Sequence, residues 1–300
     1  MPLGSRQALA QPVTSRAPSR LRRLSKYRNL VAGAAIMVLF VLISIFGPLV
    51  TPYGPNAISP LDRLQPPSAE HLMGTDHLGR DIFTRAIYGA RYSIAIAVGA
   101  ILVGGTIGWL AGVVAGYFGG KADRVVVFLV DTFLAFPMEL FALVMIATLG
   151  QGLQNLVFAI ALAVWPRVAR VVRGEVLKVV QLEYVEAAKA IGARSNRVIL
   201  KHILSNTLAP TTVALSFYVG TALLVEASLG FLGLGVPPPT PTWGRIVSDG
   251  RNYMQAAPWV ITTGGLAIGL MVLGLNLFGD GLRDAVDPRT SRVTTPTERR

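Results

Sequence analysis

The residues best placed to do chemistry in this sequence are two acids that interrupt long apolar runs, Asp131 and Glu226. A carboxylate is costly inside a lipid bilayer, so an acid in such a position is usually functional or paired. Each is expected either to hold helices together through a buried pair or backbone contact, or to line a pathway. For Glu226 the pathway role would be contact with a substrate amine. Asp131 lies nearer an aqueous boundary, where water could reach it.

A second group of ionisable residues lies in a segment rich in glycine and proline, between two apolar runs. The group consists of Asp76, Arg80, Asp81 and Arg85. Asp81 and Arg85 are one helical turn apart and would pair if that stretch is helical. The four charges could form a network that fixes this loop, or they could face another protein. The alternative is a solvated amphipathic helix, whose exposed pairs contribute little to stability.

Motifs for catalysis or metal binding are missing from the sequence. It has no G-x-x-x-x-G-K-[ST] phosphate cradle, no H-E-x-x-H and no G-x-S-x-G. His71, His77 and His202 are too scattered for a metal site, nickel included, and cysteine is absent. The chain is therefore expected to be no enzyme and to bind no metal or cofactor. Energy for any work must come from an ion gradient or from another polypeptide.

The composition is that of a protein embedded in a membrane. Hydrophobic residues make up 52% of the chain and charged residues 15%, with a mean hydropathy of +0.53. A soluble domain averages about 25% charged residues, so this chain has too little charge to cover a water-facing surface. The net charge of +12 comes from bases next to apolar runs. Such bases orient membrane helices, and nucleic-acid binding is not expected.

Six apolar segments predict an all-α membrane protein with six transmembrane helices. They are 29–50, 93–118, 124–149, the region around 156–165, 208–234 and 259–278. Residues 1–28 carry seven Lys or Arg and no acid, and the loop 166–207 carries eight against three Glu. Because Lys and Arg favour the cytoplasmic side, both termini are expected there. The predicted parts are a basic cytoplasmic tail (1–28), a transmembrane domain (29–289) and a disordered cytoplasmic tail (290–300).

The second apolar segment has glycine at every fourth position. Gly104, Gly108, Gly112 and Gly116 would form a flat groove along one side of a helix. Small residues at this period allow close approach of another helix, so the row is expected to pack.

The cytoplasmic loop 174–206 has the pattern of two short helices. Tyr184, Ala187, Ala188 and Ile191 share one helical face, because they lie at i, i+3, i+4 and i+7. Gly192 is expected to end that helix, and Ser195 to cap the next one. Two small alanines on the shared face would let another protein press close.

The same loop resembles the EAA loop of ABC importer permeases. The resemblance rests on Glu186-Ala187-Ala188, on Gly192 after three intervening residues, and on 202–204 after nine more. Ser205 stands where that family usually has proline. The resemblance implies a coupling helix that inserts into a groove on an ATPase subunit, with contacts from Tyr184, Glu186, Ala187, Ala188, Gly192 and Ser195.

Other segments resemble the peptide/nickel subfamily of these permeases. They are 71–81, 85–91, 135–137, 226–235 and 279–289, in the order expected for that subfamily. Together they are similar to the second, C-type permease of dipeptide, oligopeptide, nickel or glutathione importers.

This resemblance implies a bacterial inner-membrane complex. Its expected members are a second homologous permease, two P-loop ATPase subunits that hold ATP and magnesium, and an extracytoplasmic substrate-binding protein. The chain would form half of the translocation pathway. Di- and oligopeptides are the expected substrates, with glutathione, nickel, opines and oligosaccharides as alternatives. An ion-coupled secondary transporter is the rival class; it would usually show inverted repeats and several midplane acids.

Overall fold

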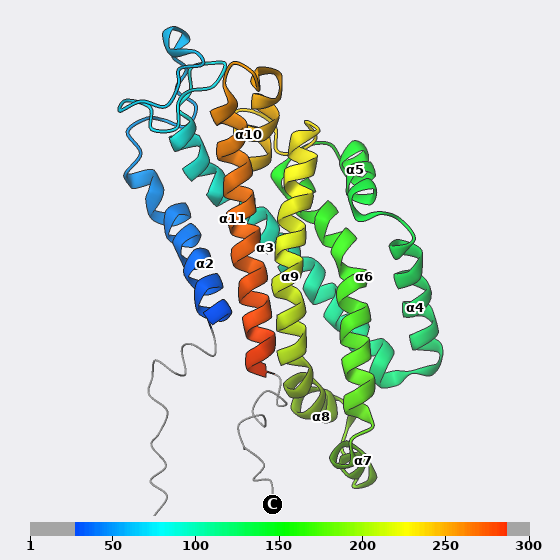
Figure 1. Cartoon of the computed structure of the whole chain (residues 1–300). Coiled ribbons are helices and arrows are strands. Elements are labelled where there is room, and N and C mark those ends of the chain that lie inside the picture. The colour runs from blue at the N-terminus through cyan, green and yellow to red at the C-terminus, as the bar shows by residue number, and fades with distance from the viewer. Residues whose placement is uncertain (1–27, 287–300) are drawn as a thin grey trace, which may run out of the picture.

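The computed structural model describes residues 28–286, and this part of the chain is helical apart from its connecting loops (Figure 1). The main helices are α2 (Arg28–Phe46), α3 (Ile82–Phe118), α4 (Gly120–Leu134), α5 (Met138–Leu149), α6 (Leu153–Val180), α7 (Glu183–Ala190), α8 (Ser195–Val198), α9 (Leu204–Phe231), α10 (Trp243–Gly250) and α11 (Pro258–Val286). A π-helical turn, η3 (Ile199–Ile203), joins α8 to α9, and short 3-10 turns are η1 (Gly47–Leu49), η2 (Pro60–Asp62) and η4 (Arg251–Tyr253). Residues 1–27 and 287–300 are not described, so the predicted tail 290–300 and all but Arg28 of the predicted tail 1–28 lie outside the described residues.

Five helices are long and apolar enough to cross a membrane, and α4 with α5 would make a sixth crossing if that bent pair is one span. The pair is bent by 87° at 135–137, so the predicted third span, 124–149, consists of two helices and not of one. Pro137 explains the break, because proline donates no backbone hydrogen bond and disfavours a helical conformation at the residue before it. The fold is thus all-α, with five or six candidate membrane helices.

Two of the predicted spans are longer than their apolar cores. α3 has 37 residues and begins eleven residues before the predicted start at 93. Its start is set by Asp81, whose carboxylate accepts a hydrogen bond from Thr84 N and so caps the helix. α9 likewise continues backwards through η3 to Ser195, giving another 37-residue helix. Both extensions carry charged residues, which a search for apolar runs does not include.

The glycine row packs α3 against α6, as predicted. A Cβ atom added at Gly104 would lie 2.5 Å from Ala161 O, and one added at Gly108 would lie 2.5 Å from Trp165 O. Both contact residues advance by four along their helices, so α3 and α6 run parallel, with backbones too close for any larger residue. The core of the molecule lies along this contact and the adjoining face of α9.

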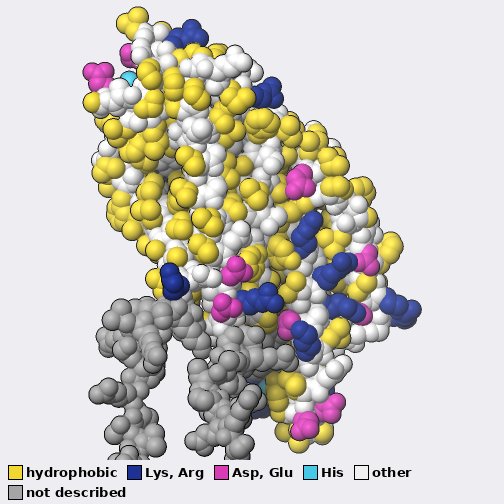
Figure 2. Space-filling model, viewed as in Figure 1, with side chains coloured by type: hydrophobic (Ala, Val, Ile, Leu, Met, Phe, Trp, Pro, Cys, Tyr) yellow, Lys and Arg dark blue, Asp and Glu magenta, His cyan; other side chains and the backbone are white. Residues whose placement is uncertain are grey.

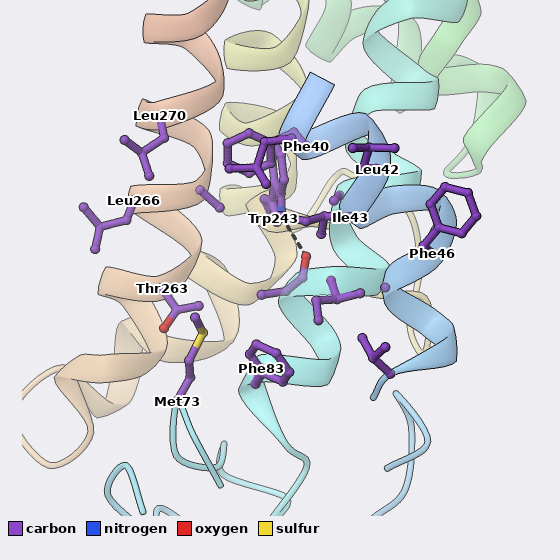
Figure 3. A pocket seen from close by; sticks show the side chains of 17 residues that line it. Phe40, Leu42, Ile43, Phe46, Met73, Phe83, Trp243, Thr263, Leu266 and Leu270 are labelled. Atoms are coloured by element: carbon purple, nitrogen blue, oxygen red, sulfur yellow. Dashed lines mark hydrogen bonds between the residues drawn. The ribbon is translucent and has the colours of Figure 1, made fainter. Parts of the chain in front are cut away.

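α2 lies at the edge of the bundle and diverges from α11 along its length (Figure 1). The two helices touch at one end, where a Cβ at Gly33 would lie 2.2 Å from Phe278 N. Towards the other end, α2, α3 and α11 enclose an apolar cavity of about 680 Å³, and Trp243 donates a 2.9 Å hydrogen bond to Ala86 O beside it (Figure 3). The side chains that line this cavity are mostly apolar, and none of them is charged.

The two ends of the bundle differ. The start of α2, the end of α11 and helices α7 and α8 lie at one end, here called the elbow end, whereas residues 47–81 and α10 lie at the other, the loop end (Figure 1). On the face shown in Figure 2, charged side chains gather towards the elbow end, and hydrophobic side chains dominate the middle. This distribution is expected of a protein whose middle faces lipid.

Candidate functional site

The first candidate site is the elbow formed by α7 and α8. Helix α7 is anchored by the buried side chain of Val185, while Tyr184 and Ile191 are 42% and 86% exposed. Glu186 and Ala187 are also exposed, and Ala188 is half-buried. The predicted face is therefore present, with an exposed apolar tip at Ile191. Exposed apolar patches of this kind mark protein contact sites.

Gly192 ends α7 as predicted. Its φ is +84°, and its N–H donates to Lys189 O at 2.9 Å while Ala193 N donates to Ala188 O at 3.0 Å. These two bonds form a Schellman motif, which satisfies the last carbonyl groups of the helix and turns the chain sharply. A side chain with Cβ is strained at this φ.

The predicted capping role of Ser195 is wrong. Arg194 occupies the N-cap position of α8, Ser195 is the first helical residue, and no side-chain hydrogen bond caps this helix. The chain therefore re-enters a helix one residue earlier after the Gly192 turn than the pattern suggested.

The elbow is joined directly to a membrane helix. α8, η3 and α9 form one continuous helix, in which Ser205 is an exposed helical residue without a break. The Tyr184 ring lies 5.6 Å from the His202 ring, and Lys189 Nζ lies 5.2 Å from the centre of the Tyr117 ring. The elbow therefore contacts the ends of two spanning helices, so force applied to α7 would reach both α9 and α3.

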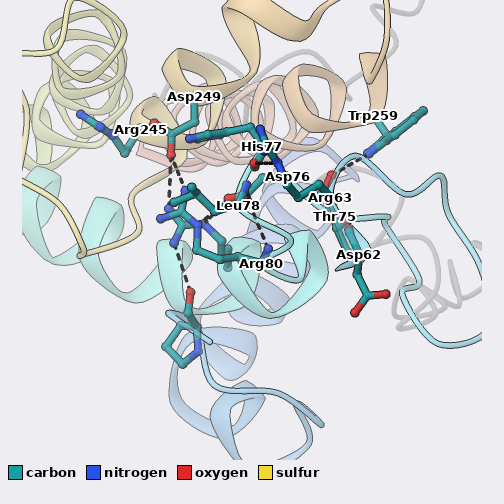
Figure 4. Close-up of polar contacts among 12 residues, drawn as sticks. Asp62, Arg63, Thr75, Asp76, His77, Leu78, Arg80, Arg245, Asp249 and Trp259 are labelled. Carbon is teal, nitrogen blue, oxygen red and sulfur yellow. Dashed lines mark hydrogen bonds and ion pairs between the residues drawn. The ribbon is translucent and has the colours of Figure 1, made fainter. Parts of the chain in front are cut away.

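The second candidate site is a buried charge cluster at the loop end (Figure 4). Asp76 Oδ2 lies 2.6 Å from Arg80 Nε and 3.8 Å from Arg85 Nε. Asp249 Oδ2 lies 3.0 Å from Arg80 Nη2 and 3.5 Å from Arg85 Nη2. All four side chains are 8% exposed or less. Three of the four predicted residues, Asp76, Arg80 and Arg85, form a buried network, in which Asp249 takes the place expected for Asp81. The alternative of a solvated helix is wrong.

Within that network the predicted pairing of Asp81 with Arg85 is also wrong. Asp81 Oδ1 lies 3.0 Å from His71 Nδ1, and Oδ2 accepts the bond from Thr84 N. Because Asp81 precedes the helix, its carboxylate turns back to the free N–H groups of the first turn. Arg85 points instead to Asp76 and Asp249, and its Nη1 donates to Pro55 O.

Asp249 is the residue that the sequence interpretation missed. Asp249 lies on α10, 164 residues after Arg85 in the sequence, and reaches the cluster from that helix. Arg245, also on α10, has its Nε 2.9 Å from Asp249 Oδ1. Thr242 caps α10 by accepting a bond from Arg245 N, and Trp243 N donates to Ser93 Oγ. The signal that could have found Asp249 is its i+4 spacing from Arg245.

The two acids in apolar runs differ in their surroundings. Glu226 is fully buried on α9, where its carboxylate lies beside the hydroxyl groups of Thr242 and Ser93. Asp131 is 58% exposed and pairs with Arg170 of α6. Asp123, in the same α4 helix, pairs with Arg173 through two bonds of 2.5 and 2.8 Å. Asp131 is thus in an exposed pair that joins α4 to α6, not in a buried one.

Within residues 28–286, no group of three or more potential ligands could hold a metal ion. His71 pairs with Asp81, and the His77 ring stacks on the Tyr253 ring with centres 5.3 Å apart. His202 lies beside Tyr184 at the elbow. The three histidines therefore contact three different partners.

Comparison with known families gives two matches that together cover most of the chain. Residues 104–292 match the family described as binding-protein-dependent transport system inner membrane component. Residues 19–67 match the N-terminal TM domain of oligopeptide transport permease C.

Curated relatives match over nearly their whole length. The dipeptide transport system permease protein DppC of Alkalihalophilus pseudofirmus is 45% identical over 89% of this chain and 88% of its own. The probable D,D-dipeptide transport system permease protein DdpC of Escherichia coli is 42% identical over 86% and 87%. The glutathione transport system permease protein GsiD of Pectobacterium atrosepticum is 40% identical over 89% of both.

Among solved structures, an inward-facing conformation of the MetNI methionine ABC transporter has a similar fold. Its chain aligns with a TM-score of 0.56 and 22% identity, over 67% of this chain and 96% of that one.

Proposed function

The chain belongs to the family of binding-protein-dependent transport system inner membrane components, and from this premise we propose that it is the C-type permease of a peptide importer. It is a permease subunit of an ABC importer in the bacterial inner membrane. The three relatives compared above are named for dipeptides, D,D-dipeptides and glutathione, all of them small peptides. This supports a short peptide as the substrate of this chain.

The proposed topology has both termini and the elbow end in the cytoplasm. The eight Lys and Arg residues of 166–207 support this, because they lie around the elbow. The loop end, with its buried charge cluster, then faces the extracytoplasmic binding protein. A second permease completes the pathway, and partner ATPases bind ATP and magnesium.

The observation that carries the proposed mechanism is the continuity of the elbow with a spanning helix. An ATPase that grips the exposed face of α7 would move the Ser195–Phe231 helix as one body. The proposed contact residues are Tyr184, Glu186, Ala187, Ala188, Gly192 and Ser195, the last in the first turn of the moving helix. Asp131 would help to hold the broken span against α6, while Glu226 remains a proposed packing or pathway residue.

The test uses Ala188→Trp and Gly192→Val in the reconstituted importer. A tryptophan on the α7 face should hold the ATPase away, and valine at φ +84° should misdirect α8 at a backbone cost of roughly 1 kcal/mol. Both variants should insert normally yet lose transport and the stimulation of ATP hydrolysis by loaded binding protein.

Matched controls separate coupling from general damage. Ala190→Trp adds the same bulk to α7 on a different side, and Gly120→Val places valine at another positive φ, +56°, outside the elbow. Both controls should keep most of the stimulation. Full stimulation in Ala188→Trp and Gly192→Val would remove the elbow from the mechanism.

The substrate is tested on the cognate binding protein, because that protein delivers it. Calorimetric titration with alanylalanine, glutathione, Ni²⁺, an opine and an oligosaccharide should give the tightest binding for a peptide. Tightest binding to Ni²⁺, the opine or the oligosaccharide would reject a peptide substrate while leaving the permease assignment intact.

A further inference from the structure

A polar pocket of about 330 Å³ lies beside the charge cluster at the loop end. Phe231 and Leu232, at the end of α9, form an apolar wall of this pocket. Arg245, Arg251 and His77 also line it, and the Arg251 guanidinium lies over the Phe231 ring. The apolar wall is fixed in place, because Ser248 Oγ donates to Phe231 O at 3.1 Å and Gln151 Nε2 donates to Gly233 O at 2.8 Å. The volume is at the small end of the range for ligand sites, about 300–1,000 Å³.

Positive charge is in excess around this pocket. Four guanidinium groups meet two carboxylates there: Arg80, Arg85, Arg245 and Arg251 against Asp76 and Asp249. The two carboxylates are shared by the first three arginines. Arg251 forms no ion pair with any residue of the described chain, and its guanidinium lies 5.6 Å from the centre of the Phe231 ring. Two positive charges therefore remain without a counterion.

Two buried polar atoms of the residues that line this pocket also lack hydrogen-bond partners. His77 Nδ1 is buried without a hydrogen bond, although the ring is held by stacking on Tyr253. Arg245 Nε is close to Asp249 but makes no hydrogen bond of acceptable geometry. A buried polar atom without a partner is costly, so these atoms favour a ligand that supplies an acceptor.

We propose that this pocket binds a carboxylate group. Arginine binds carboxylates through two parallel hydrogen bonds, and Arg251 has its donors free of any carboxylate within residues 28–286. The Phe231 and Leu232 wall accommodates a short apolar group attached to the carboxylate. This step rests on the proposed function, under which two molecules carry a carboxylate to this end of the permease. One is the peptide, through its C-terminus, and the other is the binding protein, through an acidic side chain.

The test labels a cysteine placed in the pocket. The chain contains no cysteine, so Asn252→Cys is a unique thiol at the lining, and it leaves the Ser248 bond to Phe231 intact. The reconstituted complex is treated with carboxyethyl methanethiosulfonate or with the trimethylammonium-ethyl reagent, and labelling of this chain is followed by intact mass spectrometry. The carboxylate reagent should react faster. Adding Arg251→Gln should lower the ratio of the carboxylate reagent's rate to the trimethylammonium reagent's rate by about tenfold. This is the effect expected of one nearby unit charge at intermediate dielectric constant.

The control variant is Gln65→Glu, which changes the charge of the same end by one unit without touching the pocket. It should leave the ratio within about twofold, because exposed charges are screened within about 8 Å at physiological salt. No preference for the carboxylate reagent, or equal ratios with and without Arg251, would overturn the proposal.

Protection experiments identify the source of the carboxylate. Alanylalanine at millimolar concentration should slow labelling more than its C-terminal amide if the source is the peptide, whereas protection by the binding protein alone would assign an acidic side chain. Absence of protection by both would overturn the site. These readouts do not use ATP hydrolysis, so they remain interpretable if the coupling variants keep their activity.

Discussion

At the scale of single residues, the loop end depends on side chains that share charges over long sequence distances. Asp249 is held by three arginines, two from the segment 80–85 and one from α10. Its side chain is 8% exposed, so removing its charge leaves Asp76 as the one carboxylate for the two buried guanidinium groups of Arg80 and Arg85. Breaking a buried ion pair in this way costs about 3–5 kcal/mol, far more than an exposed pair is worth.

Asp249→Asn is therefore expected to destabilise the complex strongly. The purified complex should unfold at a clearly lower temperature in a fluorescence-detected thermal scan, with about 3–5 kcal/mol lost. Glu70→Gln is the matched control, because Glu70 is an exposed acid at the same end. Its effect should stay within about 0.5 kcal/mol. Equal melting temperatures for the two variants would mean that the cluster does not hold the loop end together.

At the scale of elements, the molecule is organised by close contact between parallel helices α3 and α6. Glycine makes this contact possible, since lipid provides no hydrophobic drive for helix association and packing must supply it. The same device recurs where α2 meets α11, at Gly33 and Gly281.

Gly108→Leu should separate α3 from α6. The added Cβ would lie 2.5 Å from Trp165 O, a backbone atom that cannot move alone, so a cost of about 1–3 kcal/mol or more is expected. Gly269→Leu on α11 is the control, because a Cβ there meets no atom within 4 Å. The yield of monodisperse complex after detergent extraction should fall for Gly108→Leu and stay unchanged for the control. Unchanged yields for both would show that the helices tolerate wider spacing.

At the scale of the whole molecule, the two ends are expected to face different compartments. The proposed orientation puts Ser205 in the cytoplasm and Thr240 outside. In the cysteine-free chain, Ser205→Cys should react with a membrane-impermeant maleimide only in inverted vesicles, and Thr240→Cys only in intact spheroplasts. The reverse pattern would invert the topology, and labelling of either cysteine from both sides would contradict a fixed orientation.

The sequence by itself determined the class of the protein, the positions of its apolar helices and the family. Those features depend on local composition and spacing: apolar runs indicate the helices, glycine at every fourth residue indicates that a second helix packs closely on α3, and Gly192 marks the end of α7. Each is a property of residues close together along the chain, so no knowledge of the fold is needed to read it.

Only the tertiary structure decided which charges meet. Asp81 faces His71 because it precedes α3, and Arg85 reaches Asp249 because α10 folds back against α3. The structure likewise decided that the predicted span 124–149 is a pair of helices bent by 87° at 135–137. Ion pairing depends on distances of a few Å in space, and the 164 residues between Arg85 and Asp249 place no limit on that distance until the helices between them have packed.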